Sequence, residues 1–164
     1  MEFKFFIGFN NFYYDINNSV VELVIKFLLY QFARALNIIR RVSEVDECLA
    51  EFDSGEYCYR HEIELELILA VTDLDQPTAE FASSGDLTKI SGLIGKMVST
   101  ARLFAQFYFR CRVLPGCSGF DGTFDVKLDS DLSLTKSRIF TVQIFIERFR
   151  VLLNILQIKP LLAM

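Results

Sequence analysis

Apolar and polar residues alternate along the chain with two different periods, which predict different elements. Three segments carry apolar residues every three or four positions, the spacing of one face of an α-helix. In the first of them, Ser19 and Glu22 have the spacing of a capping box, in which each side chain satisfies a backbone donor of the other. The sequence therefore predicts three long amphipathic helices, over residues 19–52, 87–111 and 134–158.

Other segments alternate strictly between apolar and polar residues, which is typical of a strand with one buried face. Residues 3–9 follow this pattern up to Asn10-Asn11, a plausible turn, and residues 12–16 can return as a partner strand. We therefore predict an N-terminal hairpin. The clearest strand pattern covers residues 57–72.

The remaining segments complete a predicted α+β fold. Residues 73–86 are polar and contain Pro and Gly, which predicts a loop, and residues 123–129 predict a short strand. Residues 138–146 are rich in β-branched side chains, so a strand is an alternative to the helix there. We expect one α+β domain over residues 1–164, with the three long helices packed on a small, mainly antiparallel sheet.

The predicted helix at 87–111 carries an apolar seam beside a stripe of small residues. The seam keeps a three-four spacing over three heptads, which suits a helix lying lengthwise against another helix. A glycine inside a helix costs about 1 kcal/mol relative to alanine, and small residues allow close helix packing. We therefore predict an interface, formed by Leu87, Ile90, Ser91, Ile94, Gly95, Met97, Ser99, Phe104 and Tyr108.

Composition extends this pattern into a functional prediction. The chain contains 17 Phe and 6 Tyr, and 52% of its residues are hydrophobic. Even ~1,000 Å² of exposed apolar surface would oppose solubility strongly at ~25 cal/mol per Å². We predict a non-catalytic structural or adaptor subunit that binds other protein chains of a larger assembly, as a homo- or hetero-oligomer. The alternative is a small-molecule or lipid-binding domain, with Tyr57, Tyr59 and His61 in an apolar pocket.

Charge gives little indication of a nucleic-acid partner. The chain has 17 basic and 21 acidic residues, a net charge of −4, whereas nucleic-acid binding usually requires a basic face. Nucleic acid is therefore a disfavoured partner, although arginines near helix ends could meet phosphate on an organised surface. These arginines are Arg40, Arg41, Arg110, Arg112, Arg138, Arg148 and Arg150.

Candidate catalytic residues fit structural roles better. His61, the single histidine of the chain, lies on the apolar side of the predicted strand, as a core or interface histidine would. Cys117 lies in a glycine-flanked turn, but a helix precedes this turn, whereas a nucleophile elbow follows a strand. We therefore expect no enzymatic activity.

Candidate metal ligands also lack the required spacing. The four cysteines (Cys48, Cys58, Cys111 and Cys117) contain no Cys-x₂₋₄-Cys pair, and the aspartates within residues 121–131 lack the spacing of a calcium loop. Glu62, Glu64 and Glu66 alternate with apolar residues, which is typical of the solvent-exposed face of a sheet. We expect neither a metal nor a cofactor.

Localisation is predicted from what the chain lacks. The first residues do not form a secretory signal, and charges interrupt every window of ~18 residues, so no transmembrane span is expected. Peripheral membrane contact through residues 134–164 ranks below the other hypotheses. The sparse cysteines favour reduced thiols, so we predict an intracellular, reducing compartment, either the cytoplasm or an organelle matrix.

Overall fold

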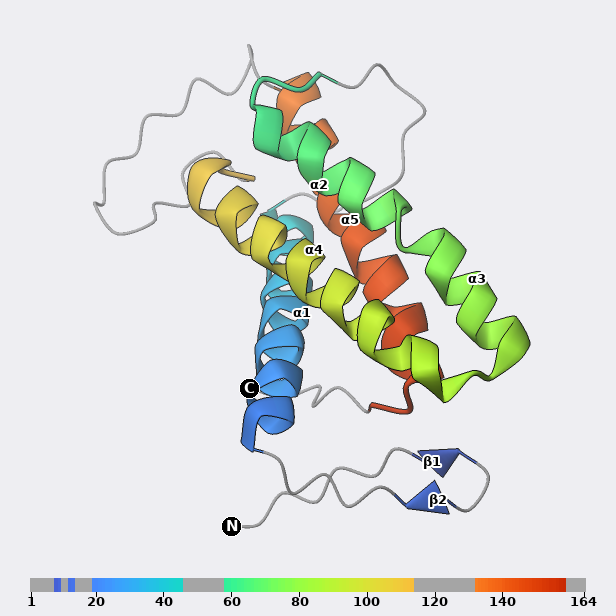
Figure 1. Cartoon of the computed structure of the whole chain (residues 1–164). Helices are drawn as coiled ribbons and strands as arrows, with labels where there is room; N and C mark the ends of the chain where they lie inside the picture. Colours follow the sequence, from blue (N-terminus) through green and yellow to red (C-terminus); the bar gives the residue numbers. More distant parts are fainter. Residues whose placement is uncertain (1–7, 10–11, 14–18, 46–57, 114–131, 159–164) are drawn as a thin grey trace.

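The computed structural model describes residues 8–9, 12–13, 19–45, 58–113 and 132–158, and nearly all of them are helical (Figure 1). The helices are α1 (Ser19–Val45), α2 (Glu62–Thr72), α3 (Asp75–Ser84), the 3-10 helix η2 (Leu87–Lys89), α4 (Ile90–Arg110) and α5 (Leu132–Ile155). Strands β1 (Gly8–Phe9) and β2 (Phe12–Tyr13) form one antiparallel pair.

Four of the helices enclose one apolar core. Helices α1 and α2 each pack against both α4 and α5, and α3 lies at one edge of the bundle against α4 and α5 (Figure 1). Stacked phenyl rings fill the space between α4 and α5. Phe104 of α4 stacks on Phe145 at a centroid distance of 4.2 Å, and Phe145 stacks on Phe149 at 4.1 Å.

This core takes up six of the nine phenylalanines whose burial the structure describes. The buried phenylalanines of the described helices are Phe32, Phe81, Phe104, Phe107, Phe145 and Phe149. A close-packed interior of this kind holds these aromatic rings away from water. In the described ranges, no helix is long and apolar enough to cross a membrane.

The predicted α+β class is wrong, because the described residues contain no sheet on which the helices pack. Strands β1 and β2 pair Gly8 with Tyr13 and Phe9 with Phe12, at the predicted N-terminal hairpin, but each strand has two residues. The strand predicted over residues 123–129 lies outside the described residues. The fold is helical.

The strand predicted over residues 57–72 is instead helix α2. Its buried residues Ile63, Leu67 and Val71 lie four apart, a spacing that fits an alternating strand and a helix equally well. The exposed positions decide between the two: Leu65 and Leu69, which a strand would bury, are 50% and 65% exposed. Glutamate and leucine both favour helices, and this preference outweighs the alternation.

Helix α3 occupies the predicted loop at residues 73–86. Pro77 lies in its first turn, where the missing N–H of proline costs no helical hydrogen bond. Gly85 ends the helix with a φ of +61°, a left-handed conformation that glycine adopts readily. Proline and glycine thus mark the two ends of a short helix here.

The three long predicted helices are confirmed in the described residues, and helix, not strand, is found over 138–146. Helix α1 starts at Ser19 as predicted. Apolar stripes of α1 and α5 are buried largely as the spacing predicts, whereas the buried stripe of α4 is rotated from the predicted seam. It consists of Leu93, Met97, Thr100, Ala101, Phe104 and Phe107.

Candidate functional site

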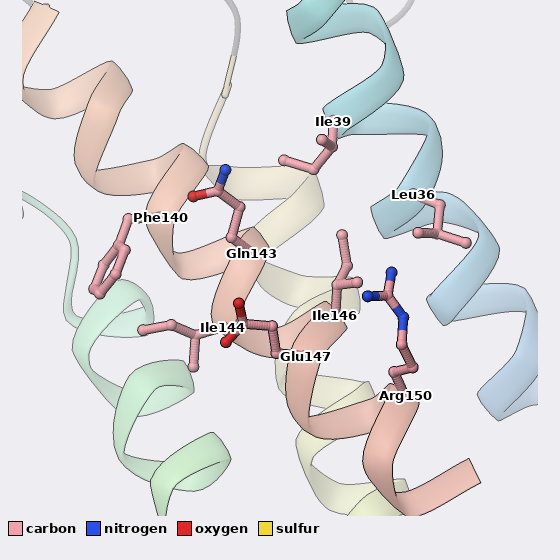
Figure 2. A pocket seen from close by; sticks show the side chains of 8 residues that line it. All are labelled: Leu36, Ile39, Phe140, Gln143, Ile144, Ile146, Glu147 and Arg150. Carbon is pink, nitrogen blue, oxygen red and sulfur yellow. The ribbon is translucent and has the colours of Figure 1, made fainter. Parts of the chain in front are cut away.

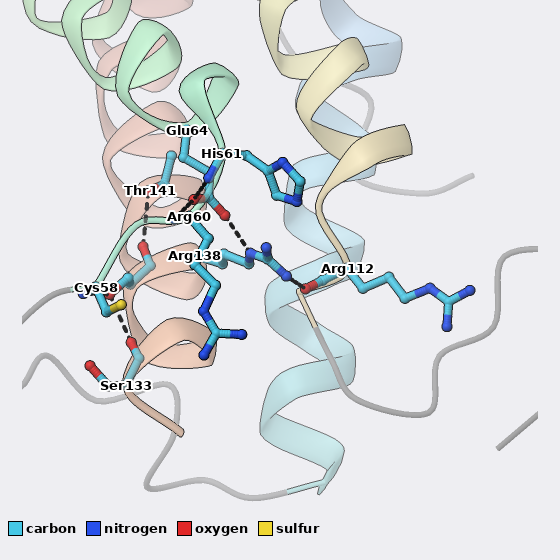
Figure 3. Close-up of polar contacts among 9 residues, drawn as sticks. Cys58, Arg60, His61, Glu64, Arg112, Ser133, Arg138 and Thr141 are labelled. Atoms are coloured by element: carbon cyan, nitrogen blue, oxygen red, sulfur yellow. Dashed lines mark hydrogen bonds and ion pairs between the residues drawn. The ribbon is translucent and has the colours of Figure 1, made fainter. Parts of the chain in front are cut away.

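A buried ion pair ties the first turn of α2 to α5 (Figure 3). The Arg138 Nε lies 2.5 Å from Oε1 of Glu64, a residue with no exposed surface. The Arg138 Nη1 also donates to the carbonyl oxygen of Arg112 at 2.7 Å. The pair therefore joins three parts of the chain: the start of α2, helix α5 and the segment that follows α4.

The second carboxylate oxygen of Glu64 caps α2. It accepts hydrogen bonds from the backbone N–H groups of Arg60 at 2.7 Å and His61 at 3.0 Å. Burial alone would raise the pKa of the Glu64 carboxyl, but these N–H groups and the Arg138 guanidinium outweigh burial and hold the pKa below its ordinary value of 4.5. Glu64 is therefore ionised at neutral pH.

Hydrogen bonds from α5 hold the segment that leads into α2. The buried Ser137 hydroxyl accepts from the Cys58 N–H at 2.7 Å and donates to the Ser133 carbonyl at 2.7 Å. The Thr141 hydroxyl donates to the Ser137 carbonyl at 2.9 Å. These bonds hold the segment before α2 against α5. Figure 3 shows that the exposed Arg112 side chain extends away from these contacts.

The Cys111 thiol lies beside this network, where burial and then the negative charge of Glu64 raise its pKa from 9.0 to about 11. Because the thiolate is the reactive form, iodoacetamide at pH 8 should modify exposed Cys58 about tenfold or more faster than Cys111. Peptide mass mapping of the folded protein measures both rates. The rates should converge after denaturation, and equal rates in the folded protein would contradict the burial of Cys111.

A groove of about 340 Å³ lies between α1 and α5 (Figure 2). Its lining is mainly apolar, and the polar groups all come from α5. Figure 2 shows the side chains of Gln143, Glu147 and Arg150 along that helix. The lining residues are Leu36, Ile39, Phe140, Gln143, Ile144, Ile146, Glu147 and Arg150.

The residues predicted to form an interface seam on α4 are divided between core and surface. Exposed Ser91 and Ser99 flank Gly95, where an added Cβ would meet nothing within 4 Å. No other described helix therefore packs closely against these small residues. The apolar members of the seam are Met97 and Phe104, which are buried, Ile90 and Ile94, which are half-buried, and Leu87 and Tyr108, which are exposed.

The other sequence candidates do not form a common site in the described part of the chain. Tyr59 is half-buried and His61 is exposed, while Tyr57 lies outside the described residues; none of the three lines the groove. Glu62 and Glu66 are exposed, as predicted for a solvent-exposed face. The prediction is wrong for Glu64, which is buried.

Candidate metal ligands are not assembled among the residues that the structure describes. No group of three or more His, Cys, Asp or Glu side chains there could hold an ion. Cys48, Cys117 and the aspartates of residues 121–131 lie outside the described residues. No local sequence pattern identified the groove or the Glu64 network.

Comparison with known proteins bears on the role of these features. The family model described as the DALR anticodon binding domain matches residues 28–164. No curated protein and no solved structure matches the chain. The matched residues include the whole lining of the groove and both members of the Glu64–Arg138 ion pair.

Proposed function

The chain belongs to the family of DALR anticodon-binding domains, and we propose that it binds the anticodon region of a transfer RNA through the groove between α1 and α5. The observation that carries this proposal is the family match over most of the chain. The groove supports it, because it combines apolar walls with polar groups in one place.

Family membership corrects the predictions that composition suggested. An anticodon-binding domain binds tRNA, so the predicted adaptor that binds other protein chains is wrong, and so is the ranking of nucleic acid as a disfavoured partner. The alternative of a small-molecule or lipid-binding domain is also contradicted, because the family binds tRNA. The physical reason is that most described phenylalanines fill the core, while a net charge of −4 says nothing about where the arginines lie.

The size and lining of the groove suit a single unpaired nucleotide. Proteins read single-stranded RNA by taking unstacked bases into contact with apolar or aromatic surfaces and by hydrogen bonding their edges. A volume of about 340 Å³ is near the lower end of the ~300–1,000 Å³ typical of ligand sites. In the groove, Leu36, Ile39 and Ile146 would contact the faces of the base.

The three polar side chains of the groove can orient that nucleotide. The Gln143 amide carries both a donor and an acceptor, as base-edge recognition requires. The Arg150 guanidinium attracts a phosphate, whereas the Glu147 carboxylate repels one and can accept a hydrogen bond from an amino group of a base. The groove would therefore hold the base against α5 and direct its phosphate toward Arg150.

Replacing Arg150 with alanine should weaken binding of an anticodon stem-loop about 5- to 20-fold and reduce the slope of log K against log salt by about 1. Fluorescence anisotropy over a salt series measures both quantities. The matched control is Arg148→Ala on the same helix, because Arg148 pairs with Asp75 at 2.9 Å and does not line the groove. Equal loss in both variants would exclude the groove as the site, and a wild-type chain that binds no stem-loop would refute the function.

We further propose that this chain contributes RNA recognition and not catalysis. Domains of this family are typical of aminoacyl-tRNA synthetases, in which recognition of the anticodon is distinct from the chemical step. A compartment that contains tRNA, the cytoplasm or an organelle matrix, is consistent with the free thiols of Cys58 and Cys111.

A further inference from the structure

An exposed cluster of aromatic rings surrounds one arginine between α1 and α4. The Arg34 guanidinium lies 4.6 Å from the ring centre of Tyr30 and 4.3 Å from that of Tyr108. It also donates to the Tyr30 hydroxyl at 2.5 Å. The Phe109 ring meets Tyr108 edge-on, with centroids 5.8 Å apart and an interplanar angle of 85°. These four residues are called the aromatic cluster below.

The rings of the aromatic cluster are exposed in a protein that buries most of its described phenylalanines. Phe109 is 77% exposed, Tyr30 48% and Tyr108 40%. One exposed ring is ordinary, but three rings gathered on one surface are a mark of a binding site. Phe109, the most exposed of the three, offers an apolar ring beside the polar groups of the two tyrosines and Arg34.

The same surface is cationic. Within the described residues, no carboxylate forms an ion pair with Arg34. Helix α4 contains no aspartate or glutamate, and its exposed Arg102 and Arg110 add positive charge. An aromatic and cationic surface matches single-stranded nucleic acid, whose bases stack on rings and whose phosphates are attracted to arginine.

We infer that the aromatic cluster is a second RNA contact, at which an unpaired base stacks on Phe109; this inference rests on the proposed function. The groove uses Leu36 and Ile39, on the flank of α1 that faces α5, whereas Arg34 contacts Tyr108 of α4 from the other flank. A helix is about 10–12 Å across, so a single-stranded loop can cross α1 and reach both flanks. Arg34 already contacts both tyrosine rings without RNA.

A tryptophan introduced at position 109 tests the stacking directly, because the chain contains no tryptophan. A base stacked on Phe109→Trp should quench its emission by about half or more when an anticodon stem-loop is added. The matched control is Leu69→Trp on α2, at a side chain that is 65% exposed and belongs to neither the groove lining nor the aromatic cluster. The emission of Leu69→Trp should change by less than about a tenth of the change that RNA causes in Phe109→Trp.

The affinity of the same stem-loop provides the second measurement. Phe109→Ala should weaken binding about 5- to 30-fold, and Phe109→Trp should retain it, since stacking on one ring is worth that much in other single-strand complexes. Unchanged affinity in Phe109→Ala, or unquenched emission with RNA bound, would overturn the inference and leave the groove proposal intact. A wild-type chain that binds no RNA would remove the proposed function and the inference with it.

Discussion

Replacing Glu64 with leucine is expected to lower the free energy of unfolding by about 3–5 kcal/mol, the usual cost of breaking a buried ion pair from one side. The Arg138 side chain, 11% exposed, would lose its charge partner. The backbone N–H groups of Arg60 and His61 would lose their acceptor at the start of α2. Urea denaturation followed by circular dichroism measures the loss.

The double variant Glu64→Leu with Arg138→Met is the control for this expectation. Exchanging both members of a buried ion pair for apolar groups is often neutral or stabilising, so the double variant should recover about half of the loss or more. If the two single losses simply add in the double variant, the pair is not coupled and the expectation is wrong.

The same ion pair predicts a dependence on pH. Folding lowers the pKa of Glu64 below its ordinary value of 4.5, so the stabilisation is fully present above that value. It is lost as the pH falls through the still lower pKa of the folded state. The difference in stability between the wild type and Glu64→Leu should therefore be constant near neutral pH and shrink in acid.

Replacing Phe145 with alanine should also cost about 3–5 kcal/mol, because a large cavity would open at the centre of the bundle. Phe145 has no exposed surface and stacks on both Phe104 and Phe149. Such ring pairs add about 0.5–1.5 kcal/mol each beyond the burial of their area. Thermal and urea denaturation should both show the loss.

Phe109→Ala is the matched control for the core substitution, since it removes the same side chain from a position that is 77% exposed. It should change the free energy of unfolding by no more than about 0.5 kcal/mol. Comparable losses in the two variants would mean that the ring stack does not hold the core together.

Helical periodicity located the long helices because each buries a regular apolar face. It failed at residues 57–72, where buried positions four apart fit a strand as well as a helix and the exposed Leu65 and Leu69 completed a false alternation. It failed again at α3, where the turn residues Pro77 and Gly85 mark helix ends and the short helix buries little apart from Phe81.

The candidate site could not be predicted from local sequence patterns, for a different reason. The groove combines residues of α1 and α5, and Glu64 meets Arg138 from a distant part of the chain. One signal was available for Glu64: on a helix it lies beside Leu67 and Val71, and an acid within an apolar stripe requires a partner. Which arginine would supply that partner depends on tertiary packing alone.

The ring stack between α4 and α5 has a consequence for selectivity. Phe145 lies between Ile144 and Ile146 in the sequence, and both of these neighbours line the groove. The stacked phenyl rings separate α4 from α5, so under the proposed function they would also influence the width available to a nucleobase between α5 and α1. Discrimination between purine and pyrimidine at this groove would then depend partly on the volume of the core side chains. It would not depend only on the groups that form hydrogen bonds with the base.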